Sequence, residues 1–191
     1  MKRTILLFVI TGFTASVSAQ GTFTDTRDGN KYKTITVQGV TWMAENLRYK
    51  APVGAYYFEN NPNNLNHYGM LYDWKTAMSV CPDGWRLPTG DEFRALITHN
   101  DVRETINAKP TEANTYSIQL AGMQDYEGTF SEMDESGYYW TSTEYDENNA
   151  EYFSYVTVFK VPVADISRKE DIEDIHGTEK TNRYSVRCVK K

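Results

Sequence analysis

Two cysteines, Cys81 and Cys188, constrain the fold of this 191-residue chain more than any other feature, because more than half of the sequence lies between them. A disulfide between them would tie the middle of the chain to its C-terminal end. Closing a loop of that size stabilises a protein by roughly 4–5 kcal/mol in the chain-entropy model. A reduced pair that binds a metal or serves catalysis is the alternative, although neither cysteine has a Cys-x-x-Cys neighbour or a nearby histidine.

The N-terminus has the pattern of a secretory signal peptide. The basic residues Lys2 and Arg3 precede an apolar run at 5–10, and residues 17–19 (Val-Ser-Ala) have the small-residue pattern of a cleavage site. We therefore expect residues 1–19 to be removed and the mature chain to begin at Gln20. A buried N-terminal helix or an uncleaved anchor is the alternative.

This pattern predicts a location outside the cytoplasm: in the periplasm, on the outer surface or in the medium. Disulfides form and persist in such compartments, so we expect the two cysteines to be bonded. The N-terminal apolar run is too short to cross about 30 Å of hydrocarbon, and no later segment is long and apolar enough. We expect no transmembrane segment in the mature chain.

A mature chain of residues 20–191 is long enough for one core, which predicts a single domain. Loss of Lys2 and Arg3 changes the net charge from −6 to −8. Nucleic-acid binding needs a basic stripe, whereas the longest basic cluster after residue 19 is Lys190-Lys191. These charges exclude nucleic acid as a partner.

Short β-prone stretches open the predicted domain. The turn dipeptides Asp28-Gly29 and Gln38-Gly39 separate three of them within residues 22–47, which predicts a three-stranded meander with two-residue turns. Residues 52–67 are rich in Asn and Pro and favour an irregular surface loop. Four later stretches have strand patterns, at 117–123, 138–144, 151–159 and 184–190, with a turn region at 124–137 and a polar, mobile hairpin insertion at 162–182.

Two helices are predicted between these strands. Apolar residues spaced by three and four indicate a helix from Tyr68 to Val80 that Pro82 ends. Thr89 and Glu92 have the spacing of a capping box, so a second helix is expected from Gly90 to about His99, with a further turn or a helical continuation at 101–108. Because helices and strands do not alternate regularly, the predicted fold class is α+β.

Six segments, in this order, resemble one bacterial family, the Fibrobacter succinogenes major paralogous domain. They are GTFTDTRDGNKYKTITVQGVTWMAENL, YGMLYDW, CPDGWRLPTGDEF, LAGMQDYEGTF, YYWTSTE and SVRCVK. Together they cover about residues 21–190. The resemblance implies an extracytoplasmic bacterial protein of largely undefined molecular function.

A more distant resemblance links the chain to C-type lectin-like and formylglycine-generating-enzyme-like folds. It is carried by residues 85–93 (WRLPTGDEF), 138–143 (YYWTST) and Arg187-Cys188. It implies a C-type lectin-like mixed fold with an N-terminal β-meander, two short helices and C-terminal antiparallel strands, but no activity. In such folds a cysteine near the first helices commonly bonds one in the last strand, which agrees with the expected bond from Cys81 to Cys188.

The motifs that give those folds their activities are missing. The lectin-type calcium and sugar motifs, Glu-Pro-Asn or Gln-Pro-Asp followed by Trp-Asn-Asp, are absent, and residues 60–63 (NNPN) echo them only loosely. Oxidases of the formylglycine-generating type need available thiols near the C-terminal part, whereas Cys81 lies in the middle of the chain. The resemblance therefore implies no catalytic residues and no cofactor.

Catalytic and metal-binding patterns are not found among the remaining candidates. His67, His99 and His176 lack the spacing of a zinc site, and Ser142 has neither a nucleophile turn nor an identifiable base. Acidic clusters occur at 125–127, 132–135 and 144–147, and none matches a defined calcium loop. Solvated loops are the expectation for these clusters, with a calcium site as the alternative.

Large aromatic residues divide into two groups. Trp42, Trp74, Trp85 and Trp140 lie inside predicted elements and are expected in the core. Tyr56, Tyr57, Tyr126 and Tyr145 fall in polar loops, where an exposed ring can stack on a sugar or on a partner, and we expect Tyr56, Tyr57 and Tyr145 to contact a ligand. Scattered surface tyrosines without a ligand are the alternative.

Two charged residues are given structural roles. The helix that begins at the capping box must pack near the last strand, so we expect Glu92 and Arg187 to approach each other or to share a partner. Glu92 acting only at its own helix start is the alternative.

The sequence thus predicts a secreted or cell-surface, non-catalytic binding or display module that recognises a glycan or a protein through loops on a rigid scaffold. Two alternatives remain, a relative of the formylglycine-generating oxidases and a structural envelope protein.

Overall fold

Two β-sheets and three short helices make up the part of the chain that the structure, a computed structural model, describes: residues 18–98, 118–158, 161–166 and 177–191. The five-stranded sheet contains, in spatial order, β1 (Ser18–Thr24), β2 (Lys31–Val37), β3 (Val40–Met43), β14 (Val189–Lys190) and β6 (Trp85–Arg86). The nine-stranded sheet contains β11 (Val161–Ile166), β10 (Asn149–Val158), β9 (Ser136–Glu144), β13 (Tyr184–Ser185), β5 (Leu71–Tyr72) and β4 (Ala55–Tyr56), together with β12 (Thr178–Glu179), β7 (Ala121–Gln124) and β8 (Phe130–Met133).

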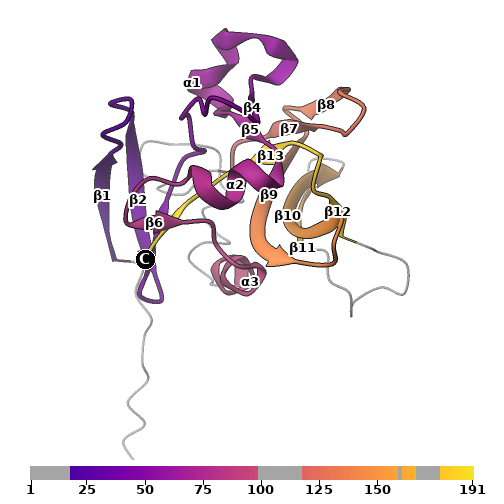
Figure 1. The fold of residues 1–191 in the computed structure, drawn as a ribbon. Coiled ribbons are helices and arrows are strands. Elements are labelled where there is room, and N and C mark those ends of the chain that lie inside the picture. Colours follow the sequence, from indigo (N-terminus) through magenta and orange to yellow (C-terminus); the bar gives the residue numbers. More distant parts are fainter. Residues whose placement is uncertain (1–17, 99–117, 159–160, 167–176) are drawn as a thin grey trace, which may run out of the picture.

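The helices lie between and beside these sheets. They are α1 (Leu65–Tyr68), α2 (Trp74–Val80) and α3 (Gly90–Thr98), with 3-10 turns η1 (Phe58–Asn60) and η2 (Pro62–Asn64). Figure 1 shows strands β1 and β2 on one side of α2 and the strongly curved strands β9 and β10 on the other. The predicted α+β class is confirmed. Within the described ranges, no helix is long and apolar enough to cross a membrane.

The N-terminal meander forms as predicted, but only one of its turns has two residues. Gln38 and Gly39 both have positive φ, 50° and 82°, as the short turn between β2 and β3 requires. The predicted two-residue turn at Asp28-Gly29 is wrong, because the loop spans residues 25–30. This longer loop is closed by a hydrogen bond of 2.8 Å from the Asp25 N–H to the Asn30 carbonyl.

The helix predicted from Tyr68 to Val80 is shorter than expected. Gly69, with a φ of 80°, follows the last residue of α1, and β5 comes before α2. The Asp73 side chain accepts a hydrogen bond from the Thr76 N–H at 2.8 Å, so α2 begins at Trp74. The apolar spacing before residue 73 therefore belongs to packed turns and a strand rather than to a helix.

Other boundaries differ where short local bonds build structure in predicted loops. Residues 52–67 hold β4, η1, η2 and the start of α1, and the Asn61 side chain starts η2 by accepting from the Asn63 N–H at 3.0 Å. The predicted turn region at 124–137 contains β8, which pairs with β7 as a hairpin. The predicted continuation at 101–108 and part of the insertion at 162–182 lie outside the described residues, as do His99 and His176.

The capping box at the start of α3 is confirmed. The Thr89 hydroxyl accepts from the Glu92 N–H at 3.2 Å, and the Glu92 carboxylate accepts from the Thr89 N–H at 2.8 Å. The same carboxylate pairs with Arg86 at 2.5 Å. The guanidinium of Arg86, with the Thr89 N–H assisting, holds the pKa of the Glu92 carboxyl below its usual value. Glu92 therefore serves its own helix start and a neighbouring arginine.

Arg187 is fully buried and contacts Asn46 and Tyr139. Its Nε–H donates to the Asn46 side-chain oxygen at 2.9 Å, and its guanidinium lies 5.2 Å from the centre of the Tyr139 ring. Asn46, also buried, donates to the Tyr68 carbonyl and to the Ser185 hydroxyl. These hydrogen bonds hold the segment around Ser185 and Arg187 in place where it passes between the two sheets.

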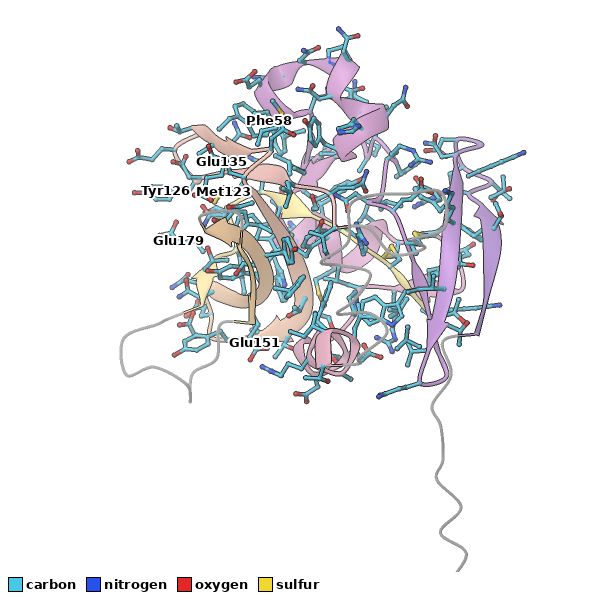
Figure 2. All side chains as sticks on the ribbon, turned by 180° about the vertical axis from the view of Figure 1, so that it is seen from behind. Phe58, Met123, Tyr126, Glu135, Glu151 and Glu179 are labelled. Carbon is cyan, nitrogen blue, oxygen red and sulfur yellow. A yellow bond between two sulfur atoms is a disulfide. The ribbon has the colours of Figure 1, made fainter. Side chains whose placement is uncertain are left out.

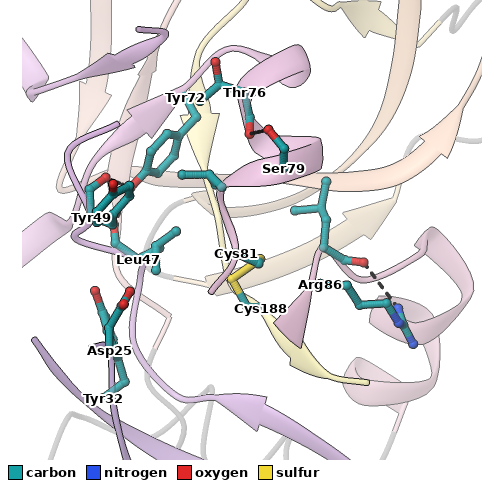
Figure 3. Close-up of a disulfide and its surroundings, with 12 residues drawn as sticks. Asp25, Tyr32, Leu47, Tyr49, Tyr72, Thr76, Ser79, Cys81, Arg86 and Cys188 are labelled. Atoms are coloured by element: carbon teal, nitrogen blue, oxygen red, sulfur yellow. Dashed lines mark hydrogen bonds between the residues drawn. A yellow bond between two sulfur atoms is a disulfide. The ribbon is translucent and has the colours of Figure 1, made fainter. Parts of the chain in front are cut away.

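The C-terminal segment joins the two sheets. Tyr184 and Ser185 belong to the nine-stranded sheet, and Val189 and Lys190 to the five-stranded one. Between them, Cys188 bonds Cys81 at the end of α2, with the two Cα atoms 5.9 Å apart (Figure 3). The predicted disulfide is confirmed.

Three of the four tryptophans lie in the core as predicted. Trp42, Trp85 and Trp140 are buried. Trp74 is only half-buried, because it starts α2 at the surface, where its indole N–H donates to the Thr141 carbonyl and Lys180 lies 4.8 Å above its ring.

Loss of the disulfide should destabilise the domain. The double variant Cys81→Ala, Cys188→Ala is expected to lose roughly 4–5 kcal/mol of unfolding free energy, because its unfolded chain regains the freedom of a long loop. Urea unfolding followed by tryptophan fluorescence measures the loss, and reduction should raise the intact mass of the wild type by that of two hydrogens. An unchanged mass, or a double variant as stable as the wild type, would contradict this assignment.

The pair of Asp25 and Arg27 should make stability depend on pH. Burial acts to raise the pKa of the Asp25 carboxyl, but the hydrogen bonds and the charge of Arg27 outweigh it and hold that pKa below its usual value. The carboxylate therefore stabilises the fold above about pH 4, and this contribution is lost as the pH falls through the lowered pKa. Asp25→Asn should cost about 1–3 kcal/mol at pH 7 and progressively less in acid.

Urea unfolding at pH 7 and in stepwise more acidic buffers checks this. Asp91→Asn is the control, because Asp91 also pairs with an arginine, Arg94, but its side chain is 91% exposed. That variant should stay close to the wild type at every pH. A penalty for Asp25→Asn that is the same at all pH values would refute the role of the carboxylate charge.

Candidate functional site

The three tyrosines predicted to bind a ligand occupy two separate places. Tyr56 lies in β4 and Tyr57 follows it, both half-buried, whereas Tyr145 lies in the turn between β9 and β10. Two strands, β13 and β5, separate β9 from β4, which amounts to roughly 14 Å across the sheet. The structure brings Tyr56 and Tyr57 together and leaves Tyr145 apart.

Each of these tyrosines is packed rather than free in a loop. The guanidinium of Arg183 lies 4.0 Å from the centre of the Tyr56 ring, and the Lys50 ammonium lies 5.2 Å from that of Tyr57. The Tyr145 side chain packs against Gly177, so closely that a Cβ at Gly177 would come within 2.9 Å of it. The loop position predicted for Tyr56 is wrong, because β4 pairs with β5 there.

A larger group of aromatic side chains gathers on one face of strands β9, β10 and β13. Alternation along β9 places Tyr138 and Trp140 on this face, and Tyr152 of β10 lies opposite Trp140 in the pairing register. Tyr184 of β13 contacts the same rings. Met123 of β7 packs against this core cluster from the direction of the β7–β8 hairpin (Figure 2).

The aromatic group has a half-buried outer layer and a buried inner layer. Met123, Tyr138 and Tyr152 are half-buried, and we refer to these three side chains as the tyrosine platform. Trp140 and Tyr184 are buried and support it. The Tyr184 ring centre lies 5.3 Å from that of Tyr138, 5.3 Å from that of Tyr152 and 4.5 Å from that of Trp140.

The opposite face of the same strands is closed. Tyr139, Phe153 and Tyr155 are buried there, and Phe93 of α3 stacks on Phe153 with ring centres 5.0 Å apart. Because α3 covers one face, the half-buried rings of Tyr138 and Tyr152 lie on the face that α3 leaves uncovered. The aromatic rings on it are held by a sheet whose other side is packed, so their positions are fixed by the fold.

Polar groups border the platform. The Tyr138 hydroxyl donates to the Glu132 carboxylate at 2.6 Å, and Asn182 donates to the Thr178 hydroxyl, which contacts the Tyr184 hydroxyl at 2.9 Å. Among the described residues, the Asn182 side-chain oxygen is buried without a hydrogen-bond partner. The rim therefore retains unused hydrogen-bonding capacity.

The hydroxyls of Tyr138 and Tyr184 stay protonated at neutral pH. Burial raises the pKa of Tyr138, and its hydrogen bond to Glu132 raises it further. Burial likewise raises the pKa of Tyr184. Neutral phenols present rings and hydrogen-bond donors, so the arrangement suits contact with a ligand.

The other sequence candidates are placed as follows. His67 lies in α1, and its ring centre is 4.6 Å from that of Tyr68. Ser142 lies in β9, and its backbone N–H donates a hydrogen bond to the Pro88 carbonyl. The carboxylates of Asp125 and Asp146 accept turn N–H groups. The described ranges contain no group of three or more His, Cys, Asp or Glu side chains that could hold a metal ion.

Sequence reasoning missed Met123, Tyr138 and Tyr152 as site residues. The alternation in YYWTSTE and EYFSYV shows that each strand has two faces. It does not show which face α3 covers, nor that Tyr152 and Trp140 are opposite each other. The pairing register supplies that information.

Comparison with known proteins gives one match. The family model described as the Fibrobacter succinogenes major domain matches residues 35–190, which is most of the chain and begins within β2. No curated protein and no solved structure matches the chain. The distant resemblance to C-type lectin-like folds therefore remains a prediction, while the expected family is confirmed: the chain belongs to the Fibrobacter succinogenes major domain family.

Proposed function

We propose that this protein is a non-catalytic, extracytoplasmic module that binds a saccharide on the tyrosine platform. One observation supports this most strongly: two half-exposed tyrosine rings, Tyr138 and Tyr152, lie with centres 6.0 Å apart on a rigid sheet face. Both rest against the buried ring of Tyr184.

Such a surface suits a sugar ring for two reasons. Tyrosine supplies a flat apolar contact with a polar end, and a ring fixed in advance loses little conformational entropy on binding. The bordering groups, among them Glu132 and Asn182, can exchange hydrogen bonds with sugar hydroxyls. The site therefore combines stacking with a polar rim.

The disulfide favours a binding module over the oxidase alternative. An oxidase of the formylglycine-generating type needs available thiols, and both cysteines of this chain are joined to each other. The buried position of Cys188, between the two sheets, gives the bond a structural role. The same disulfide supports a location in an oxidising compartment outside the cytoplasm.

Removing one platform ring should weaken saccharide binding without unfolding the protein. The mature chain is titrated calorimetrically with neutral hexasaccharides of glucose, xylose and mannose, and at least one is expected to bind. Tyr138→Ala and Tyr152→Ala should each lose about 0.5–1.5 kcal/mol, which is roughly two- to twelvefold in affinity. Tyr138→Phe keeps the ring and should retain most of the affinity.

Tyr126→Ala is the matched control, because Tyr126 is a tyrosine of the neighbouring hairpin that is 57% exposed and lies off the platform. Its affinity should equal that of the wild type. The proposal fails if no saccharide binds, or if folded Tyr138→Ala and Tyr152→Ala proteins bind as well as the wild type.

A further inference from the structure

Arg183 differs from four other arginines that the structure describes. Arg27, Arg48, Arg86 and Arg94 each pair with a carboxylate, on Asp25, Glu45, Glu92 and Asp91 respectively. Arg183 forms no ion pair within the described ranges, although the chain carries a net charge of −6. Its charge is therefore available for a ligand.

The position of Arg183 is fixed by its neighbours. Its guanidinium lies 4.0 Å from the centre of the Tyr56 ring. Its backbone exchanges two hydrogen bonds with Gln124, of 3.1 Å and 2.8 Å. The ring and the backbone bridge together hold the cation in place before any ligand arrives.

Hydrogen-bonding capacity remains unused around this cation. The Arg183 Nε and the Gln124 Oε1 are buried without a hydrogen-bond partner among the residues that the structure describes, and Gln124 is only 6% exposed. The two Nη groups of Arg183 and the Tyr56 hydroxyl make no hydrogen bond to any described residue and are not among the buried atoms. The solvent-facing end of the site thus offers the Nη fork together with one phenol hydroxyl.

The acidic residues that follow Gln124 make hydrogen bonds within their own turn. The Asp125 carboxylate accepts the Thr129 N–H at 2.8 Å, and the Glu127 carboxylate accepts the Tyr126 hydroxyl at 3.3 Å. Both carboxylates belong to the turn that follows β7 and are engaged within that turn. Within the described ranges, neither carboxylate forms an ion pair with Arg183.

We propose that Arg183, positioned by Tyr56, binds the carboxylate of a sugar acid such as a uronate. The planar fork of an arginine matches a carboxylate in a bidentate arrangement, and the charge strengthens both hydrogen bonds. The Tyr56 hydroxyl can bond a sugar hydroxyl beside that carboxylate. Binding is non-covalent and should weaken as salt screens the charges.

This inference rests on the proposed function for the saccharide class but concerns a different site. Arg183 and Tyr184 are consecutive, and alternation along the chain directs their side chains to opposite faces. Tyr184 supports the tyrosine platform, whereas Arg183 faces Tyr56. The two sites can therefore be tested separately.

The experiment compares trigalacturonate with its methyl ester, which has the same sugar backbone without the charges. Calorimetric titration of the mature protein should show tighter binding of the acid than of the ester. Arg183→Gln should weaken binding of the acid roughly ten- to hundredfold and leave binding of the ester unchanged. Arg183→Lys keeps the charge without the fork and should lose less affinity.

Arg48→Gln is the matched control, because Arg48 also stacks on a tyrosine, at 4.5 Å from the centre of the Tyr32 ring, but pairs with Glu45. It should retain the preference for the acid. Galacturonic acid itself forms a second arm. Binding of the monosaccharide assigns the site to a single sugar acid, and binding of the trimer alone assigns it to a polymer, both of which support the proposal.

Three results would overturn the proposal. They are equal binding of acid and ester by the wild type, an unchanged affinity for the acid in folded Arg183→Gln, and tighter Arg183-dependent binding of a peptide with a free C-terminal carboxylate. Neutral saccharides that bind through Tyr138 without any acid preference would contradict this site alone. An acid preference that depends on Arg183 while Tyr138→Ala changes no saccharide affinity would contradict the platform alone.

Discussion

Burial of the C-terminal segment, residues 184–189, is the constraint on which the other parts of the structure depend. All six residues are buried, and the segment passes from the nine-stranded sheet to the five-stranded one within them. Its backbone is held on the way, since the Cys188 carbonyl accepts from the Met43 N–H and the Val186 carbonyl from the Leu47 N–H. The disulfide then ties it to the end of α2. Hydrophobic burial, backbone pairing and the covalent bond therefore act on one short stretch of chain.

The two proposed sites follow from how this segment enters the fold. Tyr184, its first residue, supports Tyr138 and Tyr152 from below. Arg183, immediately before it, is left at the surface against Tyr56. A segment that is pinned at both ends by strand pairing can hold aromatic and charged side chains in fixed positions, which lowers the entropic cost of binding. Both proposed binding surfaces are therefore held in place by the buried residues beneath or beside them.

Features that depend on neighbours in sequence were predictable, and those that depend on strand register were not. The capping box of Thr89 and Glu92 involves residues three positions apart, and the structure contains it as predicted. The expected approach of Glu92 and Arg187 depends on long-range packing and stays a prediction, while the observed ion pair of Glu92 is with Arg86. The cation of Arg183 lies over Tyr56 because β4, β5 and β13 are adjacent in the sheet. Residues so far apart in sequence carry no local signal of such contact.

The central claim is that a ligand rests on the open face of β9 and β10, and nuclear magnetic resonance of isotope-labelled tyrosine rings tests it most directly. The same strands hold Tyr139 and Tyr155 on the face covered by α3, so the protein contains its own comparison. Titration with a bound neutral oligosaccharide should shift the ring signals of Tyr138 and Tyr152 and leave those of Tyr139 and Tyr155 unchanged. Shifts confined to tyrosines away from the platform, with Tyr138 and Tyr152 unaffected at saturation, would contradict the account.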